Sequence, residues 1–138
     1  MHPDYLVLLV EDDAPLRRSL EKFLNTAGYA FDSCSTAYEA LELARKVRPD
    51  VVIVEYHLPD ANGTSLLKQL MLNDPLISPI VLSEYDFQAV AQDLDHVDAG
   101  WFLKKPFDVV DIEHALSSAC SSKARRPAKN DAWQPESN

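Results

Sequence analysis

Residues 49–63 read PDVVIVEYHLPDANG, and this stretch decides the fold. Four β-branched residues in a row, after its first two positions, are typical of a short strand that is covered on both faces. The strand leads to one carboxylate, Glu55, and then to a loop that contains proline and ends at Gly63. A single carboxylate is therefore expected at the end of a buried strand.

Similar apolar runs alternate with helix-period stretches along residues 1–121. This regular order of strand and helix predicts one doubly wound α/β domain, with a parallel sheet that carries helices on both faces. The expected strands are 5–10, 29–34, 51–55, 79–83 and 101–104.

Helix signals fill the gaps between these strands. The first helix is expected from Asp13, a good N-cap, to Gly28, and the second opens with a capping-box pattern at Thr36 and stops before Pro49. Later helices are expected at about 64–72, at about 86–96 and from Asp108 onward. The pattern over 86–96 has the fewest apolar positions, whereas the last helix is expected to turn Val109 and three later apolar residues toward the sheet.

The chain is acidic, with 13 Lys and Arg against 22 Asp and Glu, a formal charge of −9 and a pI near 4.7. This balance disfavours a nucleic-acid partner. The first ten residues lack a basic region, and their apolar run is too short to span a bilayer. Cys34 and Cys120 lie in apolar stretches without metal-type spacing, which suits a reducing compartment. We therefore expect a cytoplasmic protein with neither a nucleic-acid nor a membrane partner.

The composition changes after Ser121. Residues 122–138 are rich in Ser, Lys, Arg, Ala, Pro and Asn, carry one Trp and show no periodicity. We expect residues 1–121 to form the domain and residues 122–138 to form a disordered tail, or a linker to an output domain that has been removed.

Polar residues occupy the carboxyl ends of the expected strands, which meet at one edge of a parallel sheet. This edge is expected to collect Glu11, Asp12, Asp13, Glu55, Ser83 and Lys105. The three glycines of the chain form neither a G-x-G-x-x-G nor a P-loop pattern, which argues against dinucleotide and nucleoside-triphosphate chemistry.

Four segments resemble, in order and at the usual separations, the signatures of bacterial response-regulator receiver (CheY-like) domains. These segments are 7–13 (VLLVEDD), 49–63, 79–83 (PIVLS) and 102–107 (FLKKPF). The resemblance covers residues 5–121 and implies a flavodoxin-like (βα)5 sheet in strand order 2-1-3-4-5, used in two-component phosphorelay signal transduction. It also implies signalling partners, such as a histidine kinase or an output protein, and a homodimer through the face formed by the fourth helix, fifth strand and fifth helix.

The resemblance further implies a role for each residue at the sheet edge. The Mg²⁺ ligands of the family correspond to Glu11, Asp12, Glu55 and the main-chain carbonyl of His57. Its phosphate-binding residues correspond to Ser83 and Lys105, and its switch aromatic corresponds to Phe102. The Lys105-Pro106 bond is often cis in this family. These residue types suit the chemistry, because Mg²⁺ prefers hard oxygen ligands and phosphoryl transfer needs positioned charge.

Glu55 departs from the family pattern, because it stands where the family has the phosphoacceptor Asp. The extra methylene moves the carboxylate outward by roughly 1.5 Å, and a misplacement of about 1 Å can slow a reaction on the order of 10²-fold. We therefore expect no efficient phosphorylation there. The displaced carboxylate would partly imitate a phosphoryl group beside Lys105 and Ser83. Weakened Mg²⁺ binding or a direct Glu55–Lys105 pair is expected.

We interpret the chain as a stand-alone, non-enzymatic pseudo-receiver that binds partner proteins independently of phosphorylation at residue 55. Two interpretations of Glu55 stay open, mimicry of the phosphorylated state and tolerated change in an inactive site. One alternative function is a conventional phosphorelay receiver in which Glu55, or the neighbouring Asp60, accepts phosphate from a histidine kinase. A less favoured alternative is a metal-dependent phosphohydrolase. Trp101 and Phe102 belong either to an exposed partner patch or to the core beside the edge strand.

Overall fold

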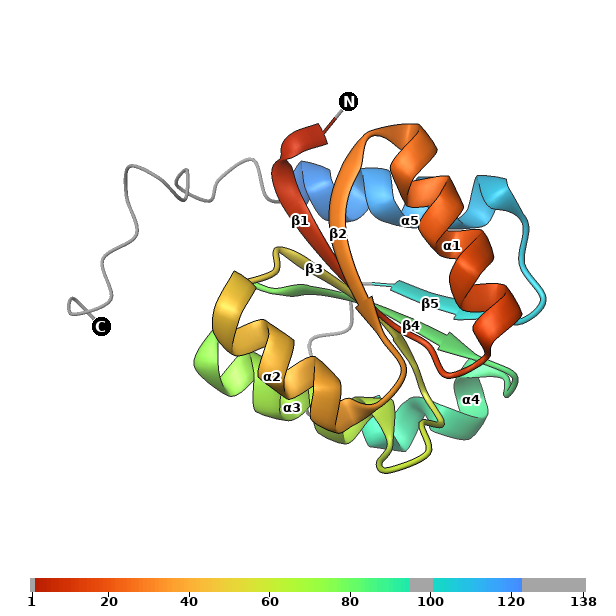
Figure 1. The fold of residues 1–138 in the computed structure, drawn as a ribbon. Coiled ribbons are helices and arrows are strands. Elements are labelled where there is room, and N and C mark those ends of the chain that lie inside the picture. The colour runs from red at the N-terminus through yellow and green to blue at the C-terminus, as the bar shows by residue number, and fades with distance from the viewer. Residues whose placement is uncertain (1, 95–100, 123–138) are drawn as a thin grey trace.

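The computed structural model describes residues 2–94 and 101–122 of the chain, shown in Figure 1. Its strands are β1 (His2–Val10), β2 (Tyr29–Cys34), β3 (Val51–Glu55), β4 (Ser78–Ser83) and β5 (Trp101–Lys104). They form one parallel sheet in the order β2-β1-β3-β4-β5, which confirms the expected topology. β1 begins earlier than expected, at His2, and its register with β2 is irregular between His2 and Leu6.

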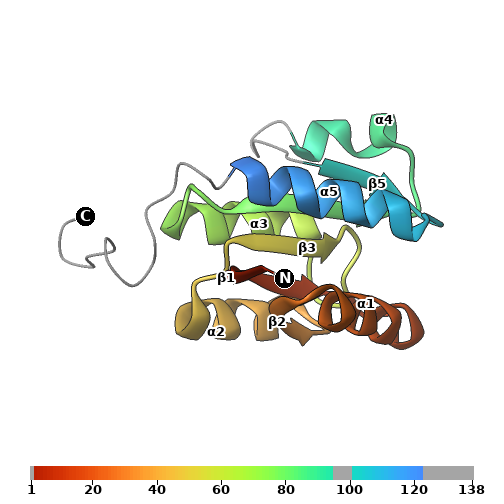
Figure 2. The same cartoon turned by 90° about the horizontal axis from the view of Figure 1, so that it is seen from above.

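Helices cover both faces of the sheet, as expected. They are α1 (Ala14–Ala27), α2 (Ala37–Val47), α3 (Gly63–Asn73), α4 (Phe87–Val90), the 3₁₀ helix η1 (Ala91–Leu94) and α5 (Val109–Ser122). Figure 1 shows α1 and α5 on one face and α2 and α3 on the other. Figure 2 shows the sheet from the side that α1 and α5 cover.

The core consists of two apolar clusters, one on each face of the sheet. Val7 and Leu9 of β1 pack with residues of α1 and α5, whereas Leu8 and Val10 pack with residues of α2 and α3. All four side chains are fully buried. Because successive side chains of a strand point to opposite faces, a strand covered on both faces must be apolar at every position. This requirement explains the continuous apolar runs of the sequence.

The helix ends follow the expected signals with one exception. Gly28 ends α1 in the left-handed conformation, with φ 88°. The Thr36 hydroxyl accepts a hydrogen bond from the Glu39 amide at 3.1 Å, which caps α2. Asp13 is the N-cap of α1, but its side chain makes no capping hydrogen bond.

The expected fourth helix is short and changes type. Residues 87–90 are α-helical and residues 91–94 form the 3₁₀ helix η1. Val90 and Leu94 supply its buried apolar contacts. The remaining two expected residues, 95 and 96, lie outside the described residues. A segment with so few apolar anchors gains little from packing as a long regular helix.

The expectation for Val109 is wrong, because this side chain is 61% exposed. Ile112, Leu116 and Ala119 of α5 are buried, as expected. Helical side chains lean toward the N-terminus of their helix, and Val109 is the first residue of α5. Its side chain therefore extends past the part of the helix that lies on the sheet.

The last described helix extends one residue past residue 121, the predicted end of the domain. α5 continues to Ser122, and the rest of the expected tail lies outside the described residues. Within residues 2–94 and 101–122, none of the helices has both the length and the apolar character needed to cross a bilayer.

The buried phenol of Tyr29 generates a prediction for alkaline pH. Burial, with contributions from Cys120 and Glu113, raises the pKa of Tyr29 to about 12. Its contribution to stability is therefore present below pH 10 and is lost as the pH rises from 10 toward 12. We predict that the free energy of unfolding falls more steeply over this range in the wild type than in Tyr29→Phe, as measured by urea denaturation. Tyr38→Phe, which alters an exposed ring, is the matched control. Equal pH dependence in the wild type and Tyr29→Phe would contradict the prediction.

Candidate functional site

The carboxyl ends of the strands bring the expected polar residues to one edge of the sheet. Glu11 follows β1, Glu55 is the last residue of β3, Ser83 is the last residue of β4, and Lys105 follows β5. In Figure 1 the arrowheads of the strands point toward this edge. The parallel topology alone places these residues together, although 94 positions separate Glu11 from Lys105 in the numbering.

Lys105 lies at the centre of this site and contacts both buried carboxylates. Its Nζ is 3.0 Å from Oε1 of Glu11 and also forms an ion pair with Oε1 of Glu55. Glu11 is 0% exposed, Glu55 is 5% exposed, and the Lys105 side chain is 15% exposed. The structure therefore contains the direct Glu55–Lys105 pair that the sequence predicts, and adds Glu11 to it. We call these three residues the buried triad.

The second oxygen of each carboxylate accepts a hydrogen bond from the main chain. The amide of Asp13 donates to Oε2 of Glu11 at 3.1 Å, and the amide of His57 donates to Oε2 of Glu55 at 2.7 Å. Apart from Lys105, the two Oε1 atoms have no hydrogen-bond partner among the described residues. Each carboxylate thus bridges the ammonium group and an amide two residues further along its own chain segment.

Burial and ion pairing have opposite effects on the pKa values of Glu11 and Lys105. Burial raises the pKa of Glu11, against the hydrogen bonds from Asp13 and Lys105, which lower it. Burial alone lowers the pKa of Lys105, but the hydrogen bonds and charges of Glu55 and Glu11 outweigh it and raise the pKa. The ammonium form of Lys105 is therefore favoured inside the site.

Main-chain contacts hold the loops that carry the triad. The amide of Glu11 donates to the Cys34 carbonyl at 3.1 Å, and the Arg17 side chain donates to the Glu11 carbonyl at 2.8 Å. A Cβ on Gly63 would lie 2.2 Å from the main-chain oxygen of Glu55. Because no side chain fits in that space, the first residue of α3 can approach the end of β3 only as glycine.

Ser83 and Phe102, the two other residues with expected roles, make different contacts. The Ser83 side chain is fully buried, and its hydroxyl accepts a hydrogen bond from the Tyr85 amide at 2.9 Å. The carbonyl of Ser83 accepts from the Lys105 amide at 2.7 Å. Phe102 is half-buried and meets Phe87 of α4 edge-on, with ring centroids 5.4 Å apart. The Lys105-Pro106 bond is cis, as the family resemblance implies.

Asp12, His57 and Asp60 contribute no side chain to the hydrogen bonds and ion pairs of the triad among the described residues, although the His57 amide donates to Glu55. The side chains of Asp12 and His57 are exposed. Asp60 is engaged elsewhere, because its two carboxylate oxygens accept hydrogen bonds from the amides of Ala37 and Tyr38 at the start of α2. These bonds lower the pKa of Asp60.

Tyr56 is a site neighbour that the sequence analysis missed. Its hydroxyl donates a hydrogen bond to the Asp93 carboxylate of η1, and its ring meets Tyr85 edge-on at 6.2 Å. The bond to Asp93, with burial, raises the pKa of Tyr56 to about 12. Because 37 positions separate the two residues and Asp93 lies in the weakest helix pattern, no local signal indicates this bond.

In this arrangement the residues present do not fit the Mg²⁺ ion that the resemblance implies. The Lys105 ammonium already contacts one oxygen of each buried carboxylate, so it competes with any cation for these two ligands. Over the described residues, no group of three or more His, Cys, Asp or Glu side chains is placed to hold a metal ion. The positive charge in the site is supplied by the protein itself.

Comparisons with known proteins identify the family. The family model described as "Response regulator receiver domain" matches residues 7–117, a range that includes the whole triad. Sporulation initiation phosphotransferase F of Bacillus subtilis (strain 168) is 28% identical over 110 residues, which cover 80% of this chain and 89% of that protein. Chemotaxis protein CheY of Thermotoga maritima is 32% identical over 112 residues, which cover 80% of this chain and 93% of that protein.

Solved structures show the same likeness. The chemotaxis response regulator CheY4 of Vibrio cholerae superposes with a TM-score of 0.79 at 25% identity, and the match covers 85% of this chain and 99% of that one.

Removal of the Lys105 charge tests the energetics of the triad. In Lys105→Met the two carboxylates lose their common cation, and we predict a loss of about 3 kcal/mol in the free energy of unfolding at pH 7, measured with urea. Lys104→Met is the matched control, because Lys104 is 54% exposed and pairs with the exposed Asp86. This control should change stability by less than about 0.5 kcal/mol. A similar effect of the two substitutions would show that the triad is not a buried, coupled group.

Proposed function

The chain belongs to the response regulator receiver domain family, and we propose that it acts within that family as a pseudo-receiver. In this role it binds partner signalling proteins without phosphorylation at residue 55, and it is not an enzyme. The observation that carries the proposal is the ion pair between Glu55 and Lys105. Lys105, which would bind the oxygens of a phosphoryl group, already has an anionic partner in the unmodified chain.

The chemistry of Glu55 supports the absence of efficient phosphorylation. A nucleophile must present a free lone pair in line with the phosphorus atom. Glu55 directs one oxygen to Lys105 and the other to the His57 amide. Its extra methylene, compared with Asp, shifts the carboxylate by roughly 1.5 Å. Both its contacts and its length therefore oppose an efficient attack.

The same contacts support partial mimicry of the phosphorylated state. A carboxylate has one charge and two acceptor oxygens, whereas a phosphoryl group has about −1.5 to −2 charges and three. Glu55 would bias the domain toward its active arrangement only by the energy of the interactions that differ between the two states. If this bias is negligible, Glu55 marks an inactive site, and the partner-binding experiment below distinguishes the two interpretations.

We propose that partners dock on the face formed by α4, β5 and α5. Tyr85, Phe87, Trp101 and Val110 expose large apolar side chains there or at its border. The partner on this face is a signalling protein, such as a histidine kinase, an output protein or a second copy of the chain. An acidic chain with a charge of −9 favours such partners over nucleic acid. Cys34 and Cys120 are buried and form no disulfide among the described residues, which suits a reducing cytoplasm.

A conventional phosphorelay receiver is the second candidate, and the family match favours it equally. In that case Glu55 itself accepts phosphate, because Asp60 already holds the start of α2 with both oxygens. A metal-dependent phosphohydrolase has less support, because Lys105 engages the carboxylates that would hold its metal.

Phosphorylation of the intact chain distinguishes the two candidates. We predict that incubation with a small phosphodonor and Mg²⁺ produces no species heavier by about 80 Da, one phosphoryl group, as measured by intact mass. Glu55→Asp shortens the side chain and should permit donor-dependent labelling, and Glu55→Gln is the control without an acceptor. A Mg²⁺-dependent labelled species in the wild type that is lost in Glu55→Gln would overturn the pseudo-receiver proposal.

Partner binding tests mimicry at residue 55. We predict that the wild type captures its partner from a lysate without phosphodonor, and that the affinity of the purified pair falls at least about fivefold in Glu55→Ala. Calorimetric titration gives the affinity, and Glu42→Ala is the control, because it removes an exposed carboxylate of α2 outside the proposed docking face. Equal affinity of the wild type and Glu55→Ala would reject mimicry and leave the inactive-site interpretation.

A further inference from the structure

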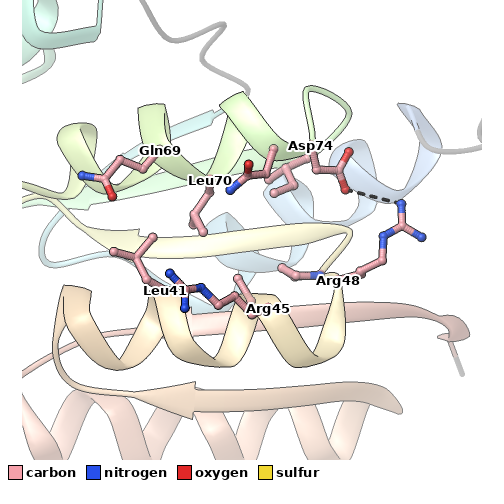
Figure 3. A pocket seen from close by; sticks show the side chains of 10 residues that line it. Leu41, Arg45, Arg48, Gln69, Leu70 and Asp74 are labelled. Atoms are coloured by element: carbon pink, nitrogen blue, oxygen red, sulfur yellow. Dashed lines mark ion pairs between the residues drawn. The ribbon is translucent and has the colours of Figure 1, made fainter. Parts of the chain in front are cut away.

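A cavity of about 500 Å³ lies between α2 and α3, at the edge of the sheet opposite the buried triad. It is lined by the C-terminal parts of both helices and by Pro49 and Ile77, which precede β3 and β4. Its volume is in the range of small-molecule sites in proteins. Figure 3 shows this cavity, and neither the triad nor the α4–β5–α5 face contributes to it.

The inner walls of the cavity are apolar. Leu41 of α2 and Leu70 of α3 point toward one another across it, as Figure 3 shows. Leu70 and Ile77 are buried, while Leu41 and Ala44 are only half-buried. Ala44 presents no more than a methyl group at a position where a larger apolar residue would fill space. The cavity is therefore an unfilled part of the interface between the two helices.

The rim of the cavity is polar and carries a net positive charge. Arg45 and Arg48 come from α2 and its C-cap, and Asp74 is the single acidic residue among the lining residues. Arg48 approaches Asp74 at 3.9 Å, the ion pair drawn as a dashed line in Figure 3. Gln69 and Asn73 add two amide groups. This local excess of positive charge contrasts with the charge of −9 of the whole chain.

The ion pair between Arg45 and Glu42 is long and exposed to solvent. Its guanidinium lies 3.8 Å from Glu42, and the Arg45 side chain is 77% exposed. An ion pair this exposed contributes little to stability, so an anion in the cavity can replace Glu42 at small cost. A guanidinium can bind a carboxylate through two parallel hydrogen bonds. The single contact of Arg45 with Glu42 does not have this geometry, so the guanidinium can still bind an anion in this way.

The helix dipoles explain only part of the positive charge at the rim of the cavity. α2 and α3 both end at the cavity, and the partial negative charge of their last carbonyls favours basic residues nearby. Arg45 and Lys46 already meet that need in the last turn of α2. Arg48 is held in the left-handed region, with φ 40°, where glycine would be less strained. A second guanidinium therefore lies at the rim on a residue whose backbone conformation glycine adopts more easily.

We propose that this cavity binds a small organic anion, a carboxylate or sulfonate with an aromatic or aliphatic body. The apolar body enters between Leu41, Ala44 and Leu70, and the acidic group meets the Arg45 guanidinium at the rim. Such a site is independent of residue 55 and therefore goes beyond the proposed function. Binding stabilises the packing of α2 against α3, because the ligand binds only the folded chain.

A pair of fluorescent probes tests the proposal on the full chain. The anionic probe is 8-anilinonaphthalene-1-sulfonate, and the neutral probe is N-phenyl-1-naphthylamine, which has the same rings without the sulfonate. We expect the anionic probe to bind the wild type more tightly. Arg45→Ala should lower the affinity for the anionic probe alone, by about tenfold. Ala44→Leu should abolish the binding of both probes, because the larger side chain fills the cavity. Lys46→Ala, an exposed basic residue of the same turn that does not line the cavity, is the control and should change neither affinity.

Two further measurements make the result decisive. Urea unfolding of each variant shows that the probe reports on folded protein, and Arg45→Ala alters an exposed side chain that folding does not require. Amide chemical shifts locate the probe, and we expect the largest changes at Ala44 and Leu70. Shifts centred on Tyr85 and Phe87, an anionic affinity unchanged in Arg45→Ala, or no binding at millimolar probe concentration would each overturn the proposal.

Discussion

The ion pairs of Lys105 with Glu11 and Glu55 are the interaction on which the site depends. Two carboxylates and one ammonium lie in a largely buried position, where an unpaired charge would be strongly disfavoured. The pairing meets this requirement only because the ends of β1 and β3 and the start of the segment after β5 meet at one edge. Topology therefore sets the chemistry, since none of the three residues is a sequence neighbour of another.

The residues next to the triad connect it to the α4 segment. Tyr56, directly after Glu55, donates to Asp93 of η1, and Lys104, directly before Lys105, pairs with Asp86 at 2.7 Å. Phe102 meets Phe87 of α4. Glu55 and Lys105 are thus direct chain neighbours of two residues whose side chains contact the segment of α4 and η1. This proximity gives the proposed docking face a physical link to residue 55 without a phosphoryl group.

Sequence patterns predicted the parts of this structure that depend on period and topology. The strands and the meeting of Glu11, Glu55, Ser83 and Lys105 at one edge follow from apolar runs and from parallel pairing, whereas the strand order was implied by the family resemblance. Long-range side-chain contacts outside the family motifs were not predictable in this way, and the bond from Tyr56 to Asp93 is the clearest example. The cavity beside Ala44 was also missed, because unfilled space between two helices depends on their separation and not on any motif.

A double-mutant cycle on Glu55 and Lys105 tests the central claim most directly. The free energies of unfolding of the wild type, Glu55→Gln, Lys105→Met and the double variant give the coupling energy of the two side chains, free of their separate effects. A buried, shared ion pair predicts a coupling of about 1.5 kcal/mol or more. If the effects of the two substitutions add to within about 0.5 kcal/mol, the two side chains act independently. The proposal that Glu55 is the anionic partner of Lys105 in the folded chain would then be wrong.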